Sequence, residues 1–317
     1  MRRRLDRSKF RGIILGAAIG DAMGMPYQFL HPQVVRESFP EPVPHFQRAP
    51  EGHVNAQYDK GQYTDETQLM MMVIETILER KAIDPDRVAQ AMVRLYQEEG
   101  WVTPGRSILA ACRRLRDGAP WHQSGGYQDG SKPLAFVPPS VLFLHRNLDG
   151  SLEQVLSLAR IILRESRVMS ACQCFSMLLH NIMQCKGEEE LVPAVRKTGR
   201  EMQRFDPSFD EILQWVVTLL PSSMEEGLQE LGTGYSVLES LFSALFTFLK
   251  HPRGYAEAVS RVVYAGDAAD NLGFLTGAFL GAFNGIEGIP ANLLEGLRDS
   301  RLILELADQL YSASSAS

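Results

Sequence analysis

Hydrophobic residues recur along most of this chain at the three- and four-residue spacing of an amphipathic α-helix. The segment TQLMMMVIETILERKA, residues 67–82, shows the spacing clearly. The same pattern predicts helices at residues 85–98, 105–117, 152–165, 167–184, 191–205, 235–250, 252–264 and 290–311. Strict alternation of apolar and polar residues, which is typical of half-buried strands, is scarce. We therefore expect an all-α protein that forms a single domain over residues 1–317, with its core at about residues 8–312.

Two segments interrupt this pattern and are rich in proline, glycine and histidine. They are FPEPVPHFQRAPEGHVNAQYDKGQY, residues 39–63, and APWHQSGGYQDGSKPLAFVPP, residues 119–139. Loops of this length inside a compact domain usually carry function. We expect both segments to be irregular and to shape a binding pocket.

Glycines recur at every fourth residue in two further segments, one near each end of the chain. The two ladders are Gly12, Gly16, Gly20 and Gly24, and Gly273, Gly277, Gly281 and Gly285. A period of four keeps the members of each ladder near one face of a helix. Because a glycine inside a helix costs about 0.5–1 kcal/mol relative to alanine, the pattern predicts helices whose backbones pack closely. Membrane-dimerisation motifs have a similar spacing, but the longest uncharged stretch here, residues 271–286, is shorter than the roughly 20 residues of a spanning helix.

Composition and charge narrow the class of protein. The 317 residues include 32 Lys and Arg against 38 Asp and Glu, a net charge of −6, whereas nucleic-acid binders normally show a basic excess. The four cysteines lack the spacing of a zinc site or a CxxC pair. The basic N-terminus MRRRLDRSKF is followed by a short apolar run without a convincing cleavage site. We expect a cytoplasmic protein with no nucleic-acid partner and no membrane segment.

Carboxylates stand at the start of two predicted helices. The tetrapeptide TDET, residues 64–67, opens the methionine-rich helix, and Asp267, Asp270 and Asn271 precede the second glycine ladder. Taken alone, each cluster is typical of helix capping. The i, i+3 spacing of Asp267 and Asp270 would place both carboxylates on one face of a helix.

Taken together, the two clusters suit a metal centre. Each offers two carboxylates and a neutral oxygen ligand, which are the ligands that Mg²⁺ and Mn²⁺ prefer. Two such ions about 3.5–4 Å apart could generate a hydroxide and clamp vicinal hydroxyl groups. Asp21 interrupts the first ladder, and a carboxylate there must be paired or metal-bound if it is buried. The seven histidines are scattered, so a zinc site is not expected.

Three blocks of the sequence resemble the signature blocks of the ADP-ribosylglycohydrolase family, which includes the dinitrogenase reductase-activating glycohydrolases. They are GAAIGDAMGMPYQF at residues 16–29, GQYTDETQLMMMV at residues 61–73 and AGDAADNLGFLTGAFLGAFNGIEGIP at residues 265–290. The blocks occur in the family's order, and GTGYSVLESLFSAL, residues 232–245, also fits. The resemblance covers about residues 8–300.

The resemblance implies an all-α, orthogonally packed fold with a centre of two Mg²⁺ or Mn²⁺ ions. It also implies hydrolysis of the glycosidic bond between ADP-ribose and a protein side chain or small acceptor. The residues that match the family's metal ligands are Thr64, Asp65, Glu66, Asp267, Asp270 and Asn271. Among them, Asp65 and Asp270 are the expected catalytic residues. The implied substrate-binding residues are Asp21, Gln28, Gly130 and Ser131, the last two through backbone N–H groups that would meet the diphosphate.

Some positions depart from the family pattern and motivate a second hypothesis. Gln28 stands where family members usually carry Glu, and a glutamine cannot act as a base. An extra residue separates Asp267 from Asp270, and the loop DGSKP, residues 129–133, lacks the family's arginine. The second hypothesis is a catalytically degenerate member that binds ADP-ribose or a metal, or serves as a scaffold. A third interpretation is an all-α protein whose acids only cap helices.

Overall fold

The computed structural model describes residues 6–314, which form helices and contain no β-strand within that range. The all-α prediction is confirmed. The outer ends of the predicted domain, residues 1–5 and 315–317, lie outside the described residues. The α-helices are α1 (Arg7–Gly24), α2 (Pro32–Ser38), α3 (Asp65–Arg80), α4 (Pro85–Gln97), α5 (Arg106–Arg116), α6 (Trp121–Ser124), α7 (Val137–Phe143), α8 (Leu148–Ile162), α9 (Ser166–Ile182), α10 (Leu191–Met202), α11 (Ser208–Thr218), α12 (Met224–Leu231), α13 (Val237–Lys250), α14 (Tyr255–Val263), α15 (Ala269–Asn284), α16 (Ala291–Gly296) and α17 (Ser300–Ser314). Short 3₁₀ helices are η1 (Lys132–Phe136), η2 (Glu188–Glu190) and η3 (Ile286–Gly288).

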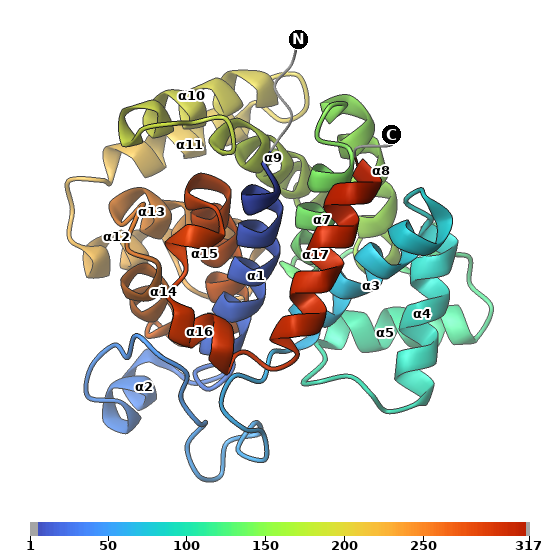
Figure 1. Ribbon diagram of the computed structural model, residues 1–317, viewed down its shortest axis with the longest axis horizontal. Helices are drawn as coiled ribbons and strands as arrows, with labels where there is room; N and C mark the ends of the chain where they lie inside the picture. The colour runs from blue at the N-terminus through green and yellow to red at the C-terminus, as the bar shows by residue number, and fades with distance from the viewer. Residues whose placement is uncertain (1–5, 315–317) are drawn as a thin grey trace.

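The two glycine-rich helices, α1 and α15, form an antiparallel pair inside the molecule (Figure 1). Their backbones touch along the ladders. A Cβ atom on Gly20 would overlap the carbonyl oxygen of Gly273, and one on Gly16 would lie 2.5 Å from the carbonyl oxygen of Gly277. The predicted close approach of helix backbones is therefore confirmed.

Other helices pack around this pair, with α13 and α14 on one side and α17 on the other (Figure 1). The buried hydroxyl of Tyr255 in α14 donates a hydrogen bond to the backbone oxygen of Gly16 at 2.5 Å. On α15, the ring of Phe279 packs against Phe175 of α9 and Phe248 of α13. The hydrophobic core thus surrounds the glycine-rich pair.

Most predicted helices are present, with ends that shift by a few residues. Residues 67–82, 85–98 and 105–117 correspond to α3, α4 and α5. The prediction of one helix over residues 290–311 is wrong, because α16 and α17 are separate helices and Asp299 between them has a left-handed φ of 56°. The short helices α2, α11 and α12 were not predicted.

The two segments predicted to be irregular differ in outcome. Residues 39–63 contain no helix, as expected. Residues 119–139 contain α6, η1 and the start of α7, so that prediction is wrong in part. Pro138 and Pro139 both lie in the first turn of α7. Proline is tolerated there because the N–H groups of a first turn have no partner within the helix.

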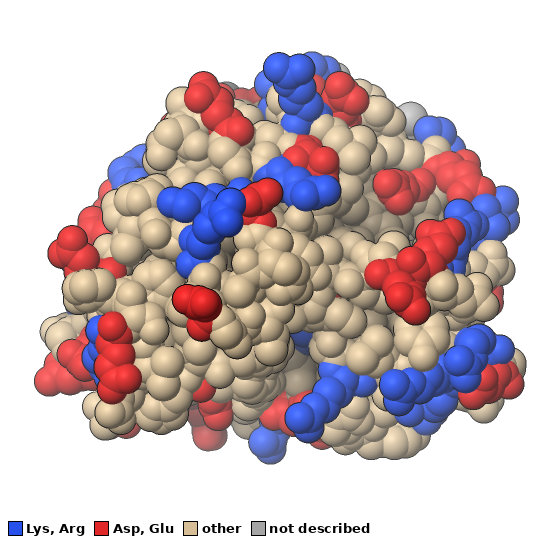
Figure 2. Space-filling model, turned by 90° about the horizontal axis from the view of Figure 1, so that it is seen from below, with Lys and Arg blue, Asp and Glu red and all other residues tan. Residues whose placement is uncertain are grey.

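The surface and the helix lengths add two observations. In the view of Figure 2, acidic and basic side chains both occur on the face shown, and several basic side chains gather along its lower right edge. Among the described helices, none combines the length and apolarity needed to span a bilayer.

Replacing Gly16 with alanine tests the pairing of α1 and α15. Alanine favours an isolated helix by about 1 kcal/mol, but here its Cβ would lie 2.5 Å from a carbonyl oxygen. We expect the free energy of unfolding to fall by about 3 kcal/mol. At Gly254, a Cβ would lie 3.5 Å from its nearest neighbour, so Gly254→Ala is the control and should cost less than about 1 kcal/mol. Urea unfolding followed by circular dichroism measures both, and a Gly16→Ala protein as stable as the wild type would contradict the close packing.

Candidate active site

Three carboxylates from distant parts of the chain meet in the interior. Asp65 and Glu66 lie in the first turn of α3, and Asp270 lies in the first turn of α15. One oxygen of each lies within 4.8 Å of the other two, and all three side chains are buried. The structure therefore brings together members of both acidic clusters, which helix capping alone does not require.

The start of α3 explains why two of these acids lie there. Thr64 is the N-cap, and its Oγ1 accepts a hydrogen bond from the backbone N–H of Glu66 at 3.4 Å. Acids in a first turn interact favourably with the positive end of the helix dipole. Asp270 has the same advantage at the start of α15. Capping and cluster formation thus use the same residues.

Asp21, near the end of α1, connects that helix to the start of α3. Its buried carboxylate accepts hydrogen bonds from the backbone N–H and hydroxyl groups of both Thr64 and Thr67, at 2.6–3.1 Å. Burial and the negative charge of Asp270 outweigh these bonds and raise the pKa of Asp21 to about 7. Since both of its oxygens bond to α3, Asp21 fixes the position of the acids in that helix.

Lys132, the first residue of η1, is a site residue that sequence analysis missed. Its Nζ lies 2.7 Å from Asp65 Oδ1, 2.8 Å from Glu66 Oε1 and 3.2 Å from Asp270 Oδ2. Only 10% of its side chain is exposed. The sequence feature that could have identified Lys132 is its position directly after Ser131, in the loop predicted to meet the substrate.

Lys132 and the carboxylates control one another's protonation. Burial opposes the charge on Lys132, but attraction to the three carboxylates outweighs it and raises the pKa of Lys132 well above 10.5. Burial raises the pKa of Asp65 and that of Glu66, while the charge on Lys132 opposes the rise. The lysine therefore stays protonated and is the electrostatic partner of the cluster.

Gln28 follows α1 and contacts the same cluster. Its Nε2 donates a hydrogen bond to Asp270 Oδ2 at 2.6 Å, and its Oε1 accepts one from Asn55 Nδ2 at 3.3 Å. The bond from Asn55 supports this orientation of the Gln28 amide. Thr103 in turn donates to Asn55 Oδ1 at 2.8 Å. The irregular segment 39–63 thus supports the site through Asn55, which sequence analysis did not identify.

Ser131 and Asn271 lie on another side of Asp270. Ser131 Oγ donates to Asn271 Oδ1 at 2.6 Å, and Asn271 Nδ2 donates to Asp270 Oδ1 at 3.0 Å. Gly130 directly precedes Ser131 and so lies beside this network. The predicted residues of the substrate loop are thereby linked to the acidic cluster.

Asp267 lies outside the three-carboxylate group. The expectation that Asp267 and Asp270 share a helical face is wrong, because α15 begins at Ala269 and Asp267 has a φ of 49°. The half-buried Asp267 carboxylate accepts a hydrogen bond from Thr233 at 3.5 Å, and its backbone oxygen accepts one from the Tyr235 hydroxyl at 2.7 Å. The extra residue before Asp270 leaves Asp267 in the connection that precedes the helix.

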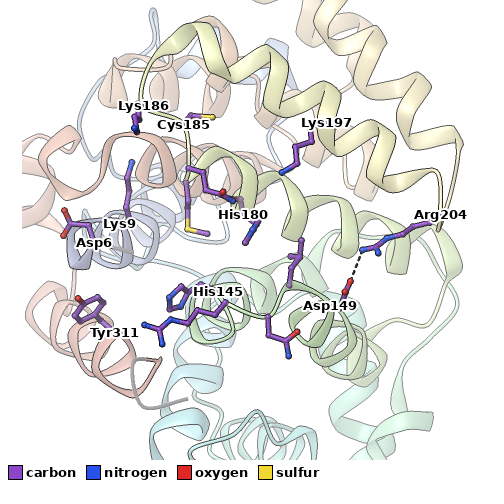
Figure 3. A pocket seen from close by; sticks show the side chains of 15 residues that line it. Asp6, Lys9, His145, Asp149, His180, Cys185, Lys186, Lys197, Arg204 and Tyr311 are labelled. Atoms are coloured by element: carbon purple, nitrogen blue, oxygen red, sulfur yellow. Dashed lines mark hydrogen bonds and ion pairs between the residues drawn. The ribbon is translucent and has the colours of Figure 1, made fainter. Parts of the chain in front are cut away.

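A large open cavity lies away from this cluster. It measures about 1120 Å³, and its lining includes Lys9, His145, Lys197 and Arg204, with Arg204 paired to Asp149 (Figure 3). None of the predicted site residues lines it. Lys9 is near the start of α1, whereas Asp21, which bonds to the start of α3, lies twelve residues later, roughly 18 Å along the helix. We therefore place the candidate site at the cluster and not in the cavity.

The cluster could hold a metal ion, because its oxygens are the hard ligands that Mg²⁺ and Mn²⁺ prefer. Lys132 already pairs with all three carboxylates, and Gln28 donates to one of them. Among the described residues, no second group of three potential ligands was found. The donor set therefore fits a divalent cation in charge and chemistry.

Asp21→Asn tests the connection between α1 and α3. An asparagine amide would place N–H donors against the N–H and hydroxyl donors of α3, so we expect a loss of about 3 kcal/mol in the free energy of unfolding. Thr67→Ser keeps the hydroxyl donor and is the control, with stability near that of the wild type. Urea unfolding measures all three proteins, and an unchanged Asp21→Asn protein would contradict the assigned role.

The cost of Asp21→Asn should also depend on pH. The pKa of Asp21 in the folded protein, about 7, is above its ordinary value of 3.8. The stability linked to this proton is thus fully present below pH 3.8 and is lost as the pH rises through 7. We expect the difference in unfolding free energy between wild type and variant to shrink by about 1.4 kcal/mol between about pH 6 and pH 8. A constant difference over this range would contradict the raised pKa.

Comparison with known proteins agrees with the motifs and the fold. The family model for ADP-ribosylglycohydrolase matches residues 2–317. A protein of Archaeoglobus fulgidus is 29% identical over 96% of this chain and 96% of its own length. ADP-ribosylarginine hydrolase Tri1 of Pseudomonas putida is 26% identical over 97% of this chain and 78% of its own length. ADP-ribosylhydrolase ARH3 of Mus musculus is 24% identical over 97% of this chain and 93% of its own length.

The fold is also found in a solved structure of an ADP-ribosylglycohydrolase-related protein complex. It matches with a TM-score of 0.78 at 24% identity and covers 99% of this chain and 100% of that chain. At this identity the likeness shows the fold, and the family model adds a match along nearly the whole sequence. The chain belongs to the ADP-ribosylglycohydrolase family.

Proposed function

We propose that this chain hydrolyses the glycosidic bond between ADP-ribose and a protein side chain or small acceptor, at the cluster of Asp65, Glu66 and Asp270. The main support is the convergence of these buried carboxylates from two helix N-termini in a member of this family. Two similar proteins, from Pseudomonas putida and Mus musculus, are named as ADP-ribosylarginine hydrolase and ADP-ribosylhydrolase. The proposed partners are therefore ADP-ribosylated proteins or small ADP-ribose adducts.

In this proposal, Asp65 and Asp270 are the catalytic residues. Cleavage of a glycosidic bond develops positive charge at the sugar ring, and nearby carboxylates stabilise that charge. Hydrogen bonds from Gly105 to Asp65 and from Asn271 to Asp270 hold the two carboxylates in place. Such preorganised charge is usually a large contribution to catalysis.

The substrate would be bound by the residues around the cluster. Backbone N–H groups of Gly130 and Ser131 are proposed to meet the diphosphate, and Gln28 is proposed to line the site beside Asp270. Asp21 has both oxygens bonded to Thr64 and Thr67. We therefore assign Asp21 a positioning role.

The proposal includes a divalent cation, Mg²⁺ or Mn²⁺. Asp65, Glu66 and Asp270 would hold it, with Thr64 and Asn271 beside them as neutral oxygen donors. When bound, such a cation supplies positive charge for hydroxyl groups and lowers the pKa of a coordinated water. The resemblance implies two ions. The ammonium nitrogen of Lys132 lies among the same carboxylates, so it competes with cations for their oxygens.

A second candidate function is ADP-ribose binding without turnover. It is favoured by Gln28, whose amide donates to Asp270 Oδ2 and cannot serve as a base. Calorimetry with ADP-ribose, combined with an assay of bond cleavage, separates the two functions. Binding at micromolar concentration without cleavage of any substrate would favour the second.

An assay of ADP-ribose release tests the proposed activity. With Mg²⁺ or Mn²⁺ present, we expect turnover of ADP-ribosyl-arginine, ADP-ribosyl-serine or O-acetyl-ADP-ribose. Asp65→Asn and Asp270→Asn should each lower kcat by about 100-fold or more.

Two further aspartates serve as comparisons in this assay. Asp149→Asn, at the distant cavity, should keep the wild-type rate. Asp267→Asn should also stay close to it, because Asp267 lies outside the carboxylate group. Folded wild-type protein that cleaves none of the three substrates would contradict the proposed hydrolase.

Gln28→Glu tests the contact with Asp270. The change would put a fourth carboxylate where an amide now donates to Asp270 Oδ2 at 2.6 Å. Like charges this close repel, so we expect a lower Tm than the wild type in chelator and a larger rise in Tm on adding Mn²⁺. Gln214→Glu, on the exposed surface of α11, is the control. Equal responses of the two variants to Mn²⁺ would contradict this expectation.

A further inference from the structure

Lys132 occupies the position that a cation would take among the three carboxylates. An ammonium group carries three N–H donors, and Nζ of Lys132 lies 2.7, 2.8 and 3.2 Å from oxygens of Asp65, Glu66 and Asp270. Two of these contacts are hydrogen bonds, to Asp65 and Asp270, while the contact with Glu66 Oε1 is an ion pair only. An ion at the same point would have to displace the lysine.

The surrounding chain holds Lys132 in this position. Lys132 begins η1, which packs against α3, and the preceding Ser131 is bonded to Asn271. Gly105 lies against the lysine stem, where an added Cβ would be 3.0 Å from Lys132 Cε. The N–H of Gly105 also donates to Asp65 Oδ2 at 2.7 Å. The lysine is thus part of the packed interior and not a surface side chain that folds over the site.

The net charge of the three carboxylates and Lys132 is consistent with Lys132 standing in the place of a cation. Three carboxylates against one ammonium leave two negative charges, which one divalent cation would balance. Two divalent cations together with Lys132 would leave an excess of buried positive charge, which is costly. Among the other polar groups near the cluster, Gln28 is neutral and Asp267 lies outside the group. The carboxylate oxygens of Asp21 are both bonded to Thr64 and Thr67.

We propose that the ammonium group of Lys132 takes the place of one of the two divalent cations that the family resemblance implies. The site then takes up at most one Mg²⁺ or Mn²⁺ ion. The inference rests on the proposed cation site, but it does not depend on turnover of any substrate.

Counting bound Mn²⁺ tests this proposal. Equilibrium dialysis and electron paramagnetic resonance would be applied to the wild type, Lys132→Met and Lys132→Arg. Lys132→Met keeps most of the stem and removes the charge, so it should bind one more Mn²⁺ per chain than the wild type. Lys132→Arg keeps the charge and should bind no more than the wild type. Two Mn²⁺ ions per wild-type chain, or equal counts for the wild type and a folded Lys132→Met protein, would overturn the proposal.

Thermal unfolding gives an independent measurement. Removing one partner of a buried ion pair is strongly destabilising, so Lys132→Met in chelator should have a Tm lower by about 10 °C. Added Mn²⁺ should recover more of the Tm in this variant than in the wild type, and an equal or smaller recovery counts against the proposal. If Lys132→Met does not fold, the wild-type count decides: two ions overturn the proposal, and one or none supports it. A chain that binds one Mn²⁺ but cleaves no substrate would contradict the proposed hydrolase and leave this inference supported.

Discussion

The contact between the backbones of α1 and α15 is the constraint on which the rest of the structure depends. Glycines at every fourth position remove the side chains that would hold the two helices apart. Because the pair is antiparallel, the end of α1 and the start of α15 lie at the same end of the molecule. Asp21 and Gln28 come from the first of these segments and Asp270 from the second. Residues more than 240 positions apart therefore contact each other directly, as Gln28 and Asp270 do.

The second constraint is that charged side chains are buried in the site, and hydrogen bonds satisfy almost all of their oxygen atoms. All oxygens of Asp65 and Asp270 accept hydrogen bonds from Lys132, Gly105, Gln28 or Asn271, among others. A carboxylate with such donors is stabilised in its ionised form even without bulk water. The site is therefore preorganised, since its charges are oriented by parts of the chain that pack in the core. The same arrangement couples the charges of the candidate site to stability, because these charges have structural partners.

Family membership indicates the type of reaction, whereas individual side chains of the site determine the charge that a cation would meet. The family model and the similar proteins that are named as hydrolases support ADP-ribosyl hydrolysis at the level of the family. Within the site, Lys132 and Gln28 both donate hydrogen bonds to the same oxygen of Asp270. They change the charge available to a cation without changing the fold. If Lys132 takes the place of one cation, as we propose, the chain keeps the scaffold of the family with fewer ions.

The sequence by itself determined most of the longer helices, the glycine ladders and the two acid-rich helix starts, because periodicity and capping depend on residues close together in the chain. Only the tertiary structure decided which acids meet. One extra residue left Asp267 in a turn, and Lys132 and Asn55 entered the site from segments whose path depends on long-range packing. A local pattern cannot show where a lysine side chain ends, because that position depends on which carboxylates the folded chain has buried around it.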